Sequence, residues 1–224
     1  MIKSERSKIV IFGGTSGLGF HFAKYLEKKG YEIIIIGRTK NKQKKNIKFH
    51  KCDFTKKKDL EKIKKILIKF KLVKLYIFAI GDNYFEDEIF PKLNLLNKIM
   101  NINLNIPIEL TKQILDNKKG GNKFLHILSD SIFNLKAKPS KIISKGALFF
   151  YIKSCKFLFE KTNNYIYGLA PGPLLFKDSY WDKIKKKDPN KFKSKKGKFK
   201  APKDYYITLD KILDKTISNT KIFT

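Results

Sequence analysis

The segment that most constrains the fold of this chain is residues 9–19, which read IVIFGGTSGLG. A short apolar run ends in a loop with four glycines, and a helical pattern of apolar residues begins directly after it. This order predicts an anion-binding turn, because bare backbone N–H groups and the positive end of a helix dipole face the loop. Glycine lets the turn be tight and lets a pyrophosphate approach the backbone closely. The alternative is a tight strand-to-helix turn that holds no ligand.

Apolar runs alternate with helical patterns along all 224 residues, which predicts a single α/β domain. Strands are expected at residues 8–12, 32–36, 47–52, 75–80, 123–128 and 165–169. Helices are expected at residues 18–29, 57–70, 93–116, 140–161 and 206–218. We expect the long third helix to bend near Pro107 and Ser140 to cap the fourth. Repeated βα units imply a Rossmann-type doubly wound parallel sheet of six or seven strands with helices on both faces. Residues 220–224 are either a short strand or irregular.

The formal net charge of +30 comes almost entirely from lysine, because Arg6 and Arg38 are the only arginines. Lysines are spread through every element, and we interpret most of them as a solvated surface. A chain this basic attracts polyanions at low salt. The scarcity of arginine and the lack of a recognised nucleic-acid module nevertheless disfavour nucleic acid as a partner. Lysine fills about half of residues 183–203, where we predict a mobile loop.

The sequence also bounds the compartment. It has no 18-residue apolar run, so no membrane span is expected. The apolar stretch after Arg6 ends at Gly13. This stretch is too short for a signal peptide, so none is expected. Cys52 and Cys155 lie far apart, and the three histidines have no metal-ligand spacing, so no metal site is expected. A cytoplasmic, reducing setting is the simplest interpretation.

The glycines at positions 13, 17 and 19 follow the spacing G-x-x-x-G-x-G. This loop is similar to the T-G-x-x-x-G-x-G loop of the short-chain dehydrogenase/reductase family, with Phe12 where that family usually has threonine. The resemblance covers about residues 7–175 and implies a nicotinamide dinucleotide as cofactor. It places the dinucleotide against the residues of the loop: Gly13, Thr15, Ser16, Gly17, Leu18 and Gly19.

The end of the second expected strand indicates which dinucleotide is bound. Proteins that select NAD commonly carry Asp or Glu there, and the carboxylate bonds the ribose 2′-hydroxyl. This chain has Gly37-Arg38-Thr39-Lys40 instead, with no acid. A guanidinium can hold a 2′-phosphate by two hydrogen bonds, whereas a carboxylate would repel it. We therefore predict that the protein binds NADP(H) in preference to NAD(H). Arg38 is the expected main contact of the 2′-phosphate, and Lys40 is a second expected contact. The alternative is that Arg38 is an ordinary surface arginine.

Further segments resemble motifs of the same family. Asp53, after the third strand, resembles the aspartate that contacts the adenine amino group, with an N-cap or turn role as an equal alternative. Gly81 matches the final glycine of the family's N-N-A-G motif. Asn103, in Ile-Asn-Leu, resembles the asparagine that holds a water in a proton relay. Pro171 and Gly172 resemble the P-G motif that lines the nicotinamide.

The catalytic pattern of the family is incomplete here. Its members reduce carbonyls with a serine that polarises the carbonyl, a tyrosine that gives the proton, and a lysine four residues after the tyrosine. The lysine lowers the phenol pKa and holds the nicotinamide ribose. Ser129 matches the serine and Lys145 matches the lysine, but Lys141 stands at the tyrosine position. No other tyrosine of the sequence aligns as a replacement.

These observations predict an NADP(H)-dependent oxidoreductase that reduces a carbonyl or oxidises an alcohol on a small substrate. Lys141 is one candidate proton donor, because repulsion from Lys145 lowers an ammonium pKa. The substrate or water is another. The alternative function is an NADP(H)-binding pseudoenzyme or partner-binding module, and a polyanion binder is less favoured.

The resemblance also implies a substrate lid and an assembly. Residues 174–203 form the lid insertion, where aromatic residues suit a flat or apolar group and lysines suit a phosphate or carboxylate. Family members often pair through their two long helices and the seventh strand. A homodimer or tetramer is therefore expected, although the short C-terminus puts the tetramer in doubt.

Overall fold

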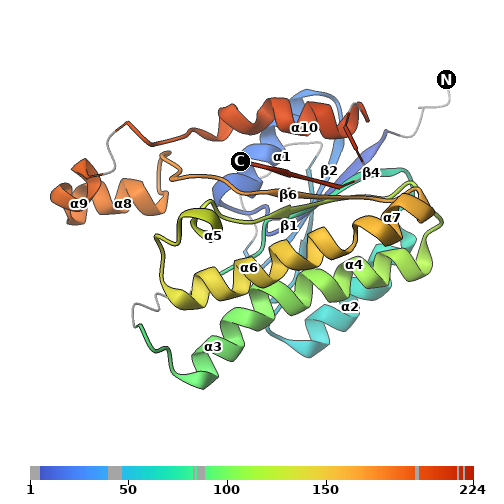
Figure 1. Cartoon of the computed structure of the whole chain (residues 1–224). Coiled ribbons are helices and arrows are strands. Elements are labelled where there is room, and N and C mark those ends of the chain that lie inside the picture. Colours follow the sequence, from blue (N-terminus) through green and yellow to red (C-terminus); the bar gives the residue numbers. More distant parts are fainter. Residues whose placement is uncertain are drawn as a thin grey trace.

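The computed structural model describes residues 6–39, 47–82, 84, 89–194, 197–215, 217–218 and 220–224. One sheet of seven strands forms its centre, in the order β3-β2-β1-β4-β5-β6-β7, and every strand pair is parallel (Figure 1). The strands are β1 (Lys8–Phe12), β2 (Glu32–Gly37), β3 (Ile47–Lys51), β4 (Val73–Phe78), β5 (Lys123–Ile127), β6 (Tyr165–Leu169) and β7 (Thr220–Phe223). The predicted doubly wound fold is confirmed.

Continuous apolar runs form the central strands because both of their faces are covered. All of β1 is buried, and so are the four isoleucines of β2. A strand inside a parallel sheet with helices on both sides has no solvent face, so its side chains do not alternate between apolar and polar. Residues Thr220–Phe223, left open by the sequence, form a short seventh strand beside β6.

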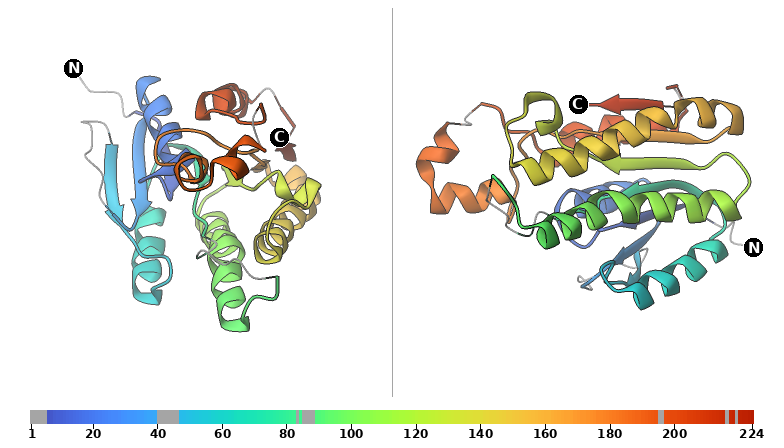
Figure 2. Two further views of the ribbon diagram at one scale, coloured as in Figure 1. Left: turned by 90° about the vertical axis from the view of Figure 1, so that its left-hand side faces the viewer. Right: turned by 60° about the horizontal axis from the view of Figure 1, so that its bottom comes forward.

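Helices cover both faces of the sheet (Figure 2). They are α1 (Gly17–Lys28), α2 (Lys57–Lys69), α3 (Leu93–Met100), the π-helical η1 (Asn101–Asn105), α4 (Ile106–Asn117), α5 (Ser131–Asn134), α6 (Pro139–Ser154), α7 (Lys156–Thr162), α8 (Tyr180–Lys187), α9 (Pro189–Lys193), the 3-10 helix η2 (Pro202–Tyr205) and α10 (Tyr206–Leu213). Apolar residues of α2, α4, α6 and α7 pack in the core on one face. Those of α1 and α10 pack in the core on the other. Such packing on two faces defines the doubly wound architecture.

The long third helix is interrupted rather than simply bent at Pro107. The π-helical turn Asn101–Asn105 separates α3 from α4, and Pro107 is the second residue of α4. Proline lacks the N–H that would bond back to the turn before it, and a wider turn accommodates that loss. The interruption matters for the site because it contains the buried residue Asn103.

The fourth expected helix, 140–161, is two helices, α6 and α7, which meet at Cys155. It begins one residue earlier than predicted, at Pro139, with Lys138 as the N-cap. The prediction of Ser140 as the N-cap is therefore wrong. Proline suits the first helical turn because its missing N–H would be unpaired there in any case.

Residues 183–193 are not the irregular loop that the lysine content predicted. Helices α8 and α9 form there, because Ser179 Oγ accepts the backbone N–H of Asp182 at 3.2 Å and Asp188 Oδ1 accepts that of Lys191 at 2.9 Å. Such N-caps stabilise short helices. An isolated parallel β-bridge between Leu174 and Lys200 joins the two ends of the segment that contains these helices. We call residues 174–200 the basic lobe, which extends beyond the carboxyl edge of the sheet (Figure 1).

The basic lobe has a small aromatic core of its own. The rings of Trp181 and Phe199 meet edge to face at 5.6 Å, and those of Phe192 and Phe199 stack at 4.8 Å. At its base, Phe176 meets His21 of α1 with ring centroids 4.8 Å apart. The lobe is thus joined to the helix that follows the glycine turn.

No helix in the described part of the chain is long and apolar enough to cross a membrane.

Candidate functional site

The glycine turn lies between β1 and α1 and packs tightly against the end of β4. Gly13 has φ +83°, and a Cβ there would lie 2.7 Å from the carbonyl oxygen of Ala79. A Cβ on Gly19 would lie 2.8 Å from the carbonyl oxygen of Gly13. Gly13 therefore needs glycine for its left-handed backbone and for the close approach of chains, and Gly19 needs it for the close approach.

The first turn of α1 is open to a ligand. Ser16 is the N-cap residue, but its side chain makes no capping hydrogen bond, and the first turn has no acidic residue. Gly17 has φ +58°, and a Cβ there would meet nothing within 4 Å. The first N–H groups of a helix have no partner within the helix, so this end fits an anion such as a pyrophosphate.

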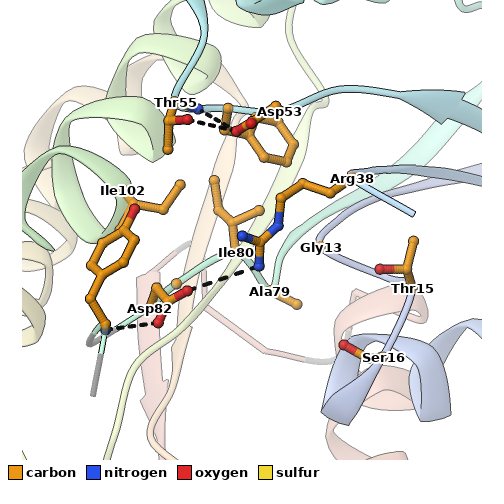
Figure 3. Close-up of a pocket in the computed structure, with 14 residues that line it drawn as sticks. Gly13, Thr15, Ser16, Arg38, Asp53, Thr55, Ala79, Ile80, Asp82 and Ile102 are labelled. Atoms are coloured by element: carbon orange, nitrogen blue, oxygen red, sulfur yellow. Dashed lines mark hydrogen bonds and ion pairs between the residues drawn. The ribbon is translucent and has the colours of Figure 1, made fainter. Parts of the chain in front are cut away.

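A pocket opens beside this turn, at the carboxyl ends of β1 to β4 (Figure 3). Its lining includes predicted cofactor-binding residues: Gly13, Thr15, Ser16, Arg38, Asp53 and Gly81. Residues that the sequence reasoning did not select complete it: Gly37, Phe54, Thr55, Ala79, Ile80, Asp82, Tyr84 and Ile102. β4 ends at Phe78, two residues earlier than predicted, so the residues after it form part of the pocket wall. Lys40 lies outside the described residues.

The remaining predicted site residues lie outside this pocket lining: Gly17, Leu18, Gly19, Asn103, Ser129, Lys141, Lys145, Pro171 and Gly172. Leu18 is buried in the core between α1 and the sheet. Gly81 connects the two groups, because it lines the pocket while a Cβ there would lie 3.3 Å from Lys145 Nζ. Gly81 thus lies between the pocket and the side chain of Lys145 on α6.

Asp53 forms a turn at the end of β3. Its Oδ1 accepts the backbone N–H of Thr55 at 3.1 Å and the Thr55 hydroxyl at 2.7 Å. The Thr55 hydroxyl bond is the main cause that lowers the pKa of Asp53. The turn role, one of the two alternatives, is therefore present, and the carboxylate also faces the pocket (Figure 3).

Arg38 points across the pocket towards Asp82 (Figure 3). Its Nη2 lies 3.9 Å from Asp82 Oδ2, and 67% of the Arg38 side chain is exposed. Asp82 directly follows Gly81, so its place after the fourth strand was a usable sequence signal. The contact between Asp82 and Arg38 could not be predicted from the sequence, because the two residues lie 44 positions apart.

The side chain of Asn103 forms hydrogen bonds with both the chain after β4 and helix α6. Its Oδ1 accepts the backbone N–H of Asp82 at 3.0 Å, and its Nδ2 donates to the Asp82 carbonyl and to Ser144 Oγ, each at 3.0 Å. The side chain is buried. The amide of Asn103 therefore orders both the pocket wall and the start of the helix that carries Lys145.

Lys145 is a buried lysine beside Gly81. Its Nζ donates to the carbonyl oxygen of Ile127 at 2.8 Å. Burial, and secondly the nearby charge of Lys141, lower the pKa of Lys145 to about 7. Burial also lowers the pKa of Lys141, against the opposing effect of Asp130. Two lysines spaced by four share a helix face, so the charge of Lys141 disfavours a charge on Lys145.

Ser129 lies buried just after β5. Its Oγ accepts the hydroxyl of Ser131 at 2.9 Å. The next residue, Asp130, ties this strand end to the P-G-P segment after β6, because its N–H donates to the carbonyl of Pro171 at 3.1 Å. A Cβ on Gly172 would lie 3.6 Å from Asp130 Oδ2.

Tyr205 reaches the same place from η2. Its hydroxyl accepts the N–H of Gly172 at 3.1 Å, and its ring is buried against α1 and α10. Burial raises the pKa of its phenol. The sequence carried no signal for this contact, since Tyr205 lies 33 residues after Gly172 and beyond the basic lobe.

Solved structures share this fold over nearly the whole chain. A short chain dehydrogenase family protein from Francisella tularensis superposes with a TM-score of 0.82 at 20% identity, over 98% of this chain and 96% of that one. A short chain dehydrogenase from Leptospira borgpetersenii, solved with bound NAD+, gives 0.77 at 14% identity, over 98% and 91%. An actinorhodin polyketide ketoreductase variant with NADPH gives 0.81 at 13% identity, over 100% and 97%.

A curated relative matches only a short segment. It is the probable arogenate/prephenate dehydrogenase of Methanocaldococcus jannaschii, 43% identical over 54 residues. That segment is 24% of this chain and 12% of the relative.

Fold and glycine turn together define a Rossmann-type nucleotide-binding protein. The chain belongs to the NAD dependent epimerase/dehydratase family, whose model matches residues 9–147. The resemblance to short-chain dehydrogenases and reductases inferred from the sequence is thereby confirmed.

Proposed function

We propose that this protein is an NADP(H)-dependent oxidoreductase that interconverts a carbonyl and an alcohol on a small anionic substrate. The observation that carries the proposal is the uncapped N-terminus of α1, which opens beside the same pocket as Arg38. The N–H groups of the turn bind the pyrophosphate, and the guanidinium binds the 2′-phosphate. When bound, the cofactor supplies or accepts the hydride. Structures of the same fold with NAD+ or NADPH support a nicotinamide dinucleotide.

Ser129 after β5 and the lysines of α6 supply the remaining chemistry. Ser129 polarises the substrate carbonyl, and Lys145 orients the nicotinamide ribose. Lys141, at the position of the family's tyrosine, gives the proton to the forming alkoxide. Its burial supports this role, because burial disfavours the charged ammonium. Asn103 is a positioning residue that holds α6 against the pocket wall.

The basic lobe supports an anionic substrate. It carries 11 lysines and three aspartates, a net charge of +8 in 27 residues. Two of these carboxylates accept backbone N–H groups, Asp182 from Asp178 and Asp188 from Lys191. Among the described residues, none of the lobe's lysines forms an ion pair with a carboxylate. The lobe follows the P-G-P segment directly in the chain.

One observation favours a second function. Lys141 replaces the phenol that the family uses as its acid. General acid help is worth about 10²–10⁴-fold, so a protein without it can keep cofactor binding while losing useful turnover. The second candidate is therefore an NADP(H)-binding pseudoenzyme.

Titration of the full chain with NADPH, NADH and ADP-ribose tests the proposal. We expect NADPH to bind more tightly than NADH, and Arg38→Gln to weaken NADPH binding about tenfold with little effect on NADH. Lack of binding by all three ligands would overturn the proposed function. Binding without turnover across a panel of anionic carbonyl compounds would favour the pseudoenzyme.

We also propose a homodimer formed by α6 and α7. Three aromatic or aliphatic side chains spaced by seven residues are solvent-exposed there: Ile143 (49%), Phe150 (70%) and Phe157 (64%). An exposed apolar stripe of this kind favours association, because burial removes it from water. A second copy of the chain presents the same stripe, which makes the contact self-complementary.

A further inference from the structure

Three charged side chains meet in the pocket, and each follows a different strand. Arg38 follows β2, Asp53 follows β3, and Asp82 follows β4. Since β1 lies between β2 and β4, Arg38 and Asp82 flank the glycine turn that follows β1. Their ion pair, at 3.9 Å, spans the pocket from one side of the turn to the other (Figure 3).

Asp82 is held in place without help from Arg38. Both its backbone N–H and its carbonyl bond to the amide of Asn103, and its Oδ1 accepts the N–H of Tyr84 at 2.8 Å. The carboxylate therefore stays in the pocket if the guanidinium turns away. Arg38, with two thirds of its side chain exposed, is the partner with room to move.

A 2′-phosphate meets two obstacles in this arrangement. It needs the guanidinium that Asp82 already holds, and it approaches a fixed carboxylate of like charge. A 2′-hydroxyl meets neither obstacle, because it is neutral and can donate a hydrogen bond to a carboxylate. NAD-selecting proteins carry such an acid after the second strand, whereas Asp82 follows the fourth.

We propose that Asp82 is a specificity-determining residue, which limits the preference for NADP(H) over NAD(H) by competing with the 2′-phosphate for Arg38. The proposal rests on the proposed function, because it requires a dinucleotide at the glycine turn. It predicts that the protein accepts both cofactors with a smaller difference in affinity than a free arginine would produce.

The test compares the wild type with Asp82→Asn in binding titrations with NADPH, NADH, ADP-ribose and its 2′-phosphate. Asparagine keeps an oxygen to accept the N–H of Tyr84, so the pocket wall is preserved. We expect the ratio of NADPH to NADH affinity to rise about tenfold, because the Arg38 guanidinium is released from its ion pair and becomes free to hold the 2′-phosphate. The ratio for the two ADP-ribose compounds should rise equally, because they lack the nicotinamide half.

Two further variants separate competition from simple repulsion. In an Arg38→Gln background, adding Asp82→Asn should change the ratio by less than about threefold, because no guanidinium is left to release. Asp53→Asn removes another pocket carboxylate, whose Oδ1 is already bonded to Thr55, and should also change the ratio less than Asp82→Asn.

An unchanged ratio in Asp82→Asn, or an equal change with and without Arg38, overturns the proposal while leaving the proposed function intact. If the wild type binds no dinucleotide, both the proposed function and the role of Asp82 are overturned. That outcome is recognised by the absence of binding itself, whereas failure of the Asp82 proposal alone concerns only the ratio of the two affinities.

Discussion

Asn103 and Ser144 join the π-helical turn η1 to helix α6 through a buried hydrogen bond of 3.0 Å. The same amide holds the backbone of Asp82 on both its N–H and its carbonyl. A π-helical turn, a strand end and the lysine-bearing helix therefore meet at one side chain. The pocket wall depends on this residue although the amide itself does not line the pocket.

Replacing Asn103 by alanine should destabilise the fold by about 3 kcal/mol, because three hydrogen bonds are lost and their buried partners are left unsatisfied. Chemical denaturation measures the change. Asn101→Ala, an exposed position in the same π-helical turn, is the matched control and should change stability by about 0.5 kcal/mol or less. Equal effects of the two substitutions would show that the hydrogen bonds of the Asn103 side chain do not stabilise the fold.

The stability of the protein should rise with pH above neutrality through Lys145. Its pKa is about 7 in the folded protein, below the ordinary value of 10.5. Between these values the unfolded chain binds the proton and the folded chain releases it, so unfolding becomes harder as pH rises. Below pH 7 both states are protonated and this contribution is flat.

Urea denaturation between pH 7 and 9.5 tests this dependence. Lys145→Met should remove part of the rise, whereas Lys153→Met, an exposed position on the same helix, should leave it unchanged. Lys123, whose pKa burial lowers to about 8, contributes in the upper part of the range in all three proteins. Identical pH profiles for wild type and Lys145→Met would contradict the prediction.

Restoring the phenol at position 141 should increase carbonyl reduction. Lys141→Tyr recreates the Tyr-x-x-x-Lys spacing with Lys145, and a positioned acid is worth about 10²–10⁴-fold in rate. Lys141→Phe has the same ring without the hydroxyl and is the matched control. Steady-state kinetics with NADPH and an anionic ketone should give a kcat at least about 100-fold higher for the tyrosine variant than for the phenylalanine variant. Equal rates would mean that position 141 does not supply the proton.

His126 is a buried residue that phenylalanine should be able to replace without loss of stability. It stacks on Phe78 with ring centroids 4.4 Å apart, and its Nδ1 is buried with no hydrogen-bond partner among the described residues. Burial lowers the pKa of His126 to about 3, so the ring is neutral. Its other ring nitrogen, Nε2, lies 3.5 Å from the Thr111 hydroxyl, which itself donates to the carbonyl of Pro107 at 2.8 Å.

His126→Phe should therefore raise the free energy of unfolding by about 1 kcal/mol, because an unsatisfied buried polar atom is removed and the stack is kept. His126→Ala should lower it by about 3 kcal/mol through the cavity it leaves. Thermal and chemical denaturation measure both. A destabilised phenylalanine variant would mean that Nδ1 has a partner, such as a bound water.

The α6–α7 stripe should control self-association. Phe150→Glu places a charge in the exposed apolar stripe and should shift the protein from dimer to monomer in sedimentation experiments. Tyr180→Glu, at an aromatic position in the basic lobe that is 57% exposed, is the control and should leave the dimer intact. A wild-type protein that is monomeric at high concentration would refute the proposed dimer.

Local pattern predicted most of the architecture. The strand boundaries of β1 and β6 match the prediction, because an apolar run between polar or glycine residues marks a buried strand without reference to the rest of the chain. The interruption at residues 101–105 and the helices of the basic lobe were missed. A run of lysines gives no apolar periodicity, and the caps at Ser179 and Asp188 are local signals that the lysine content obscured.

The sequence by itself determined the glycine turn, the parallel α/β fold and the presence of Arg38 after the second strand. These features depend on neighbours in the chain, where periodicity and glycine spacing act directly. Only the tertiary structure decided what Arg38 meets. The sheet order sets β2 and β4 on either side of β1, and this brings Asp82 to the guanidinium although 44 residues separate them. Sequence spacing cannot give a contact that arises from the order of strands.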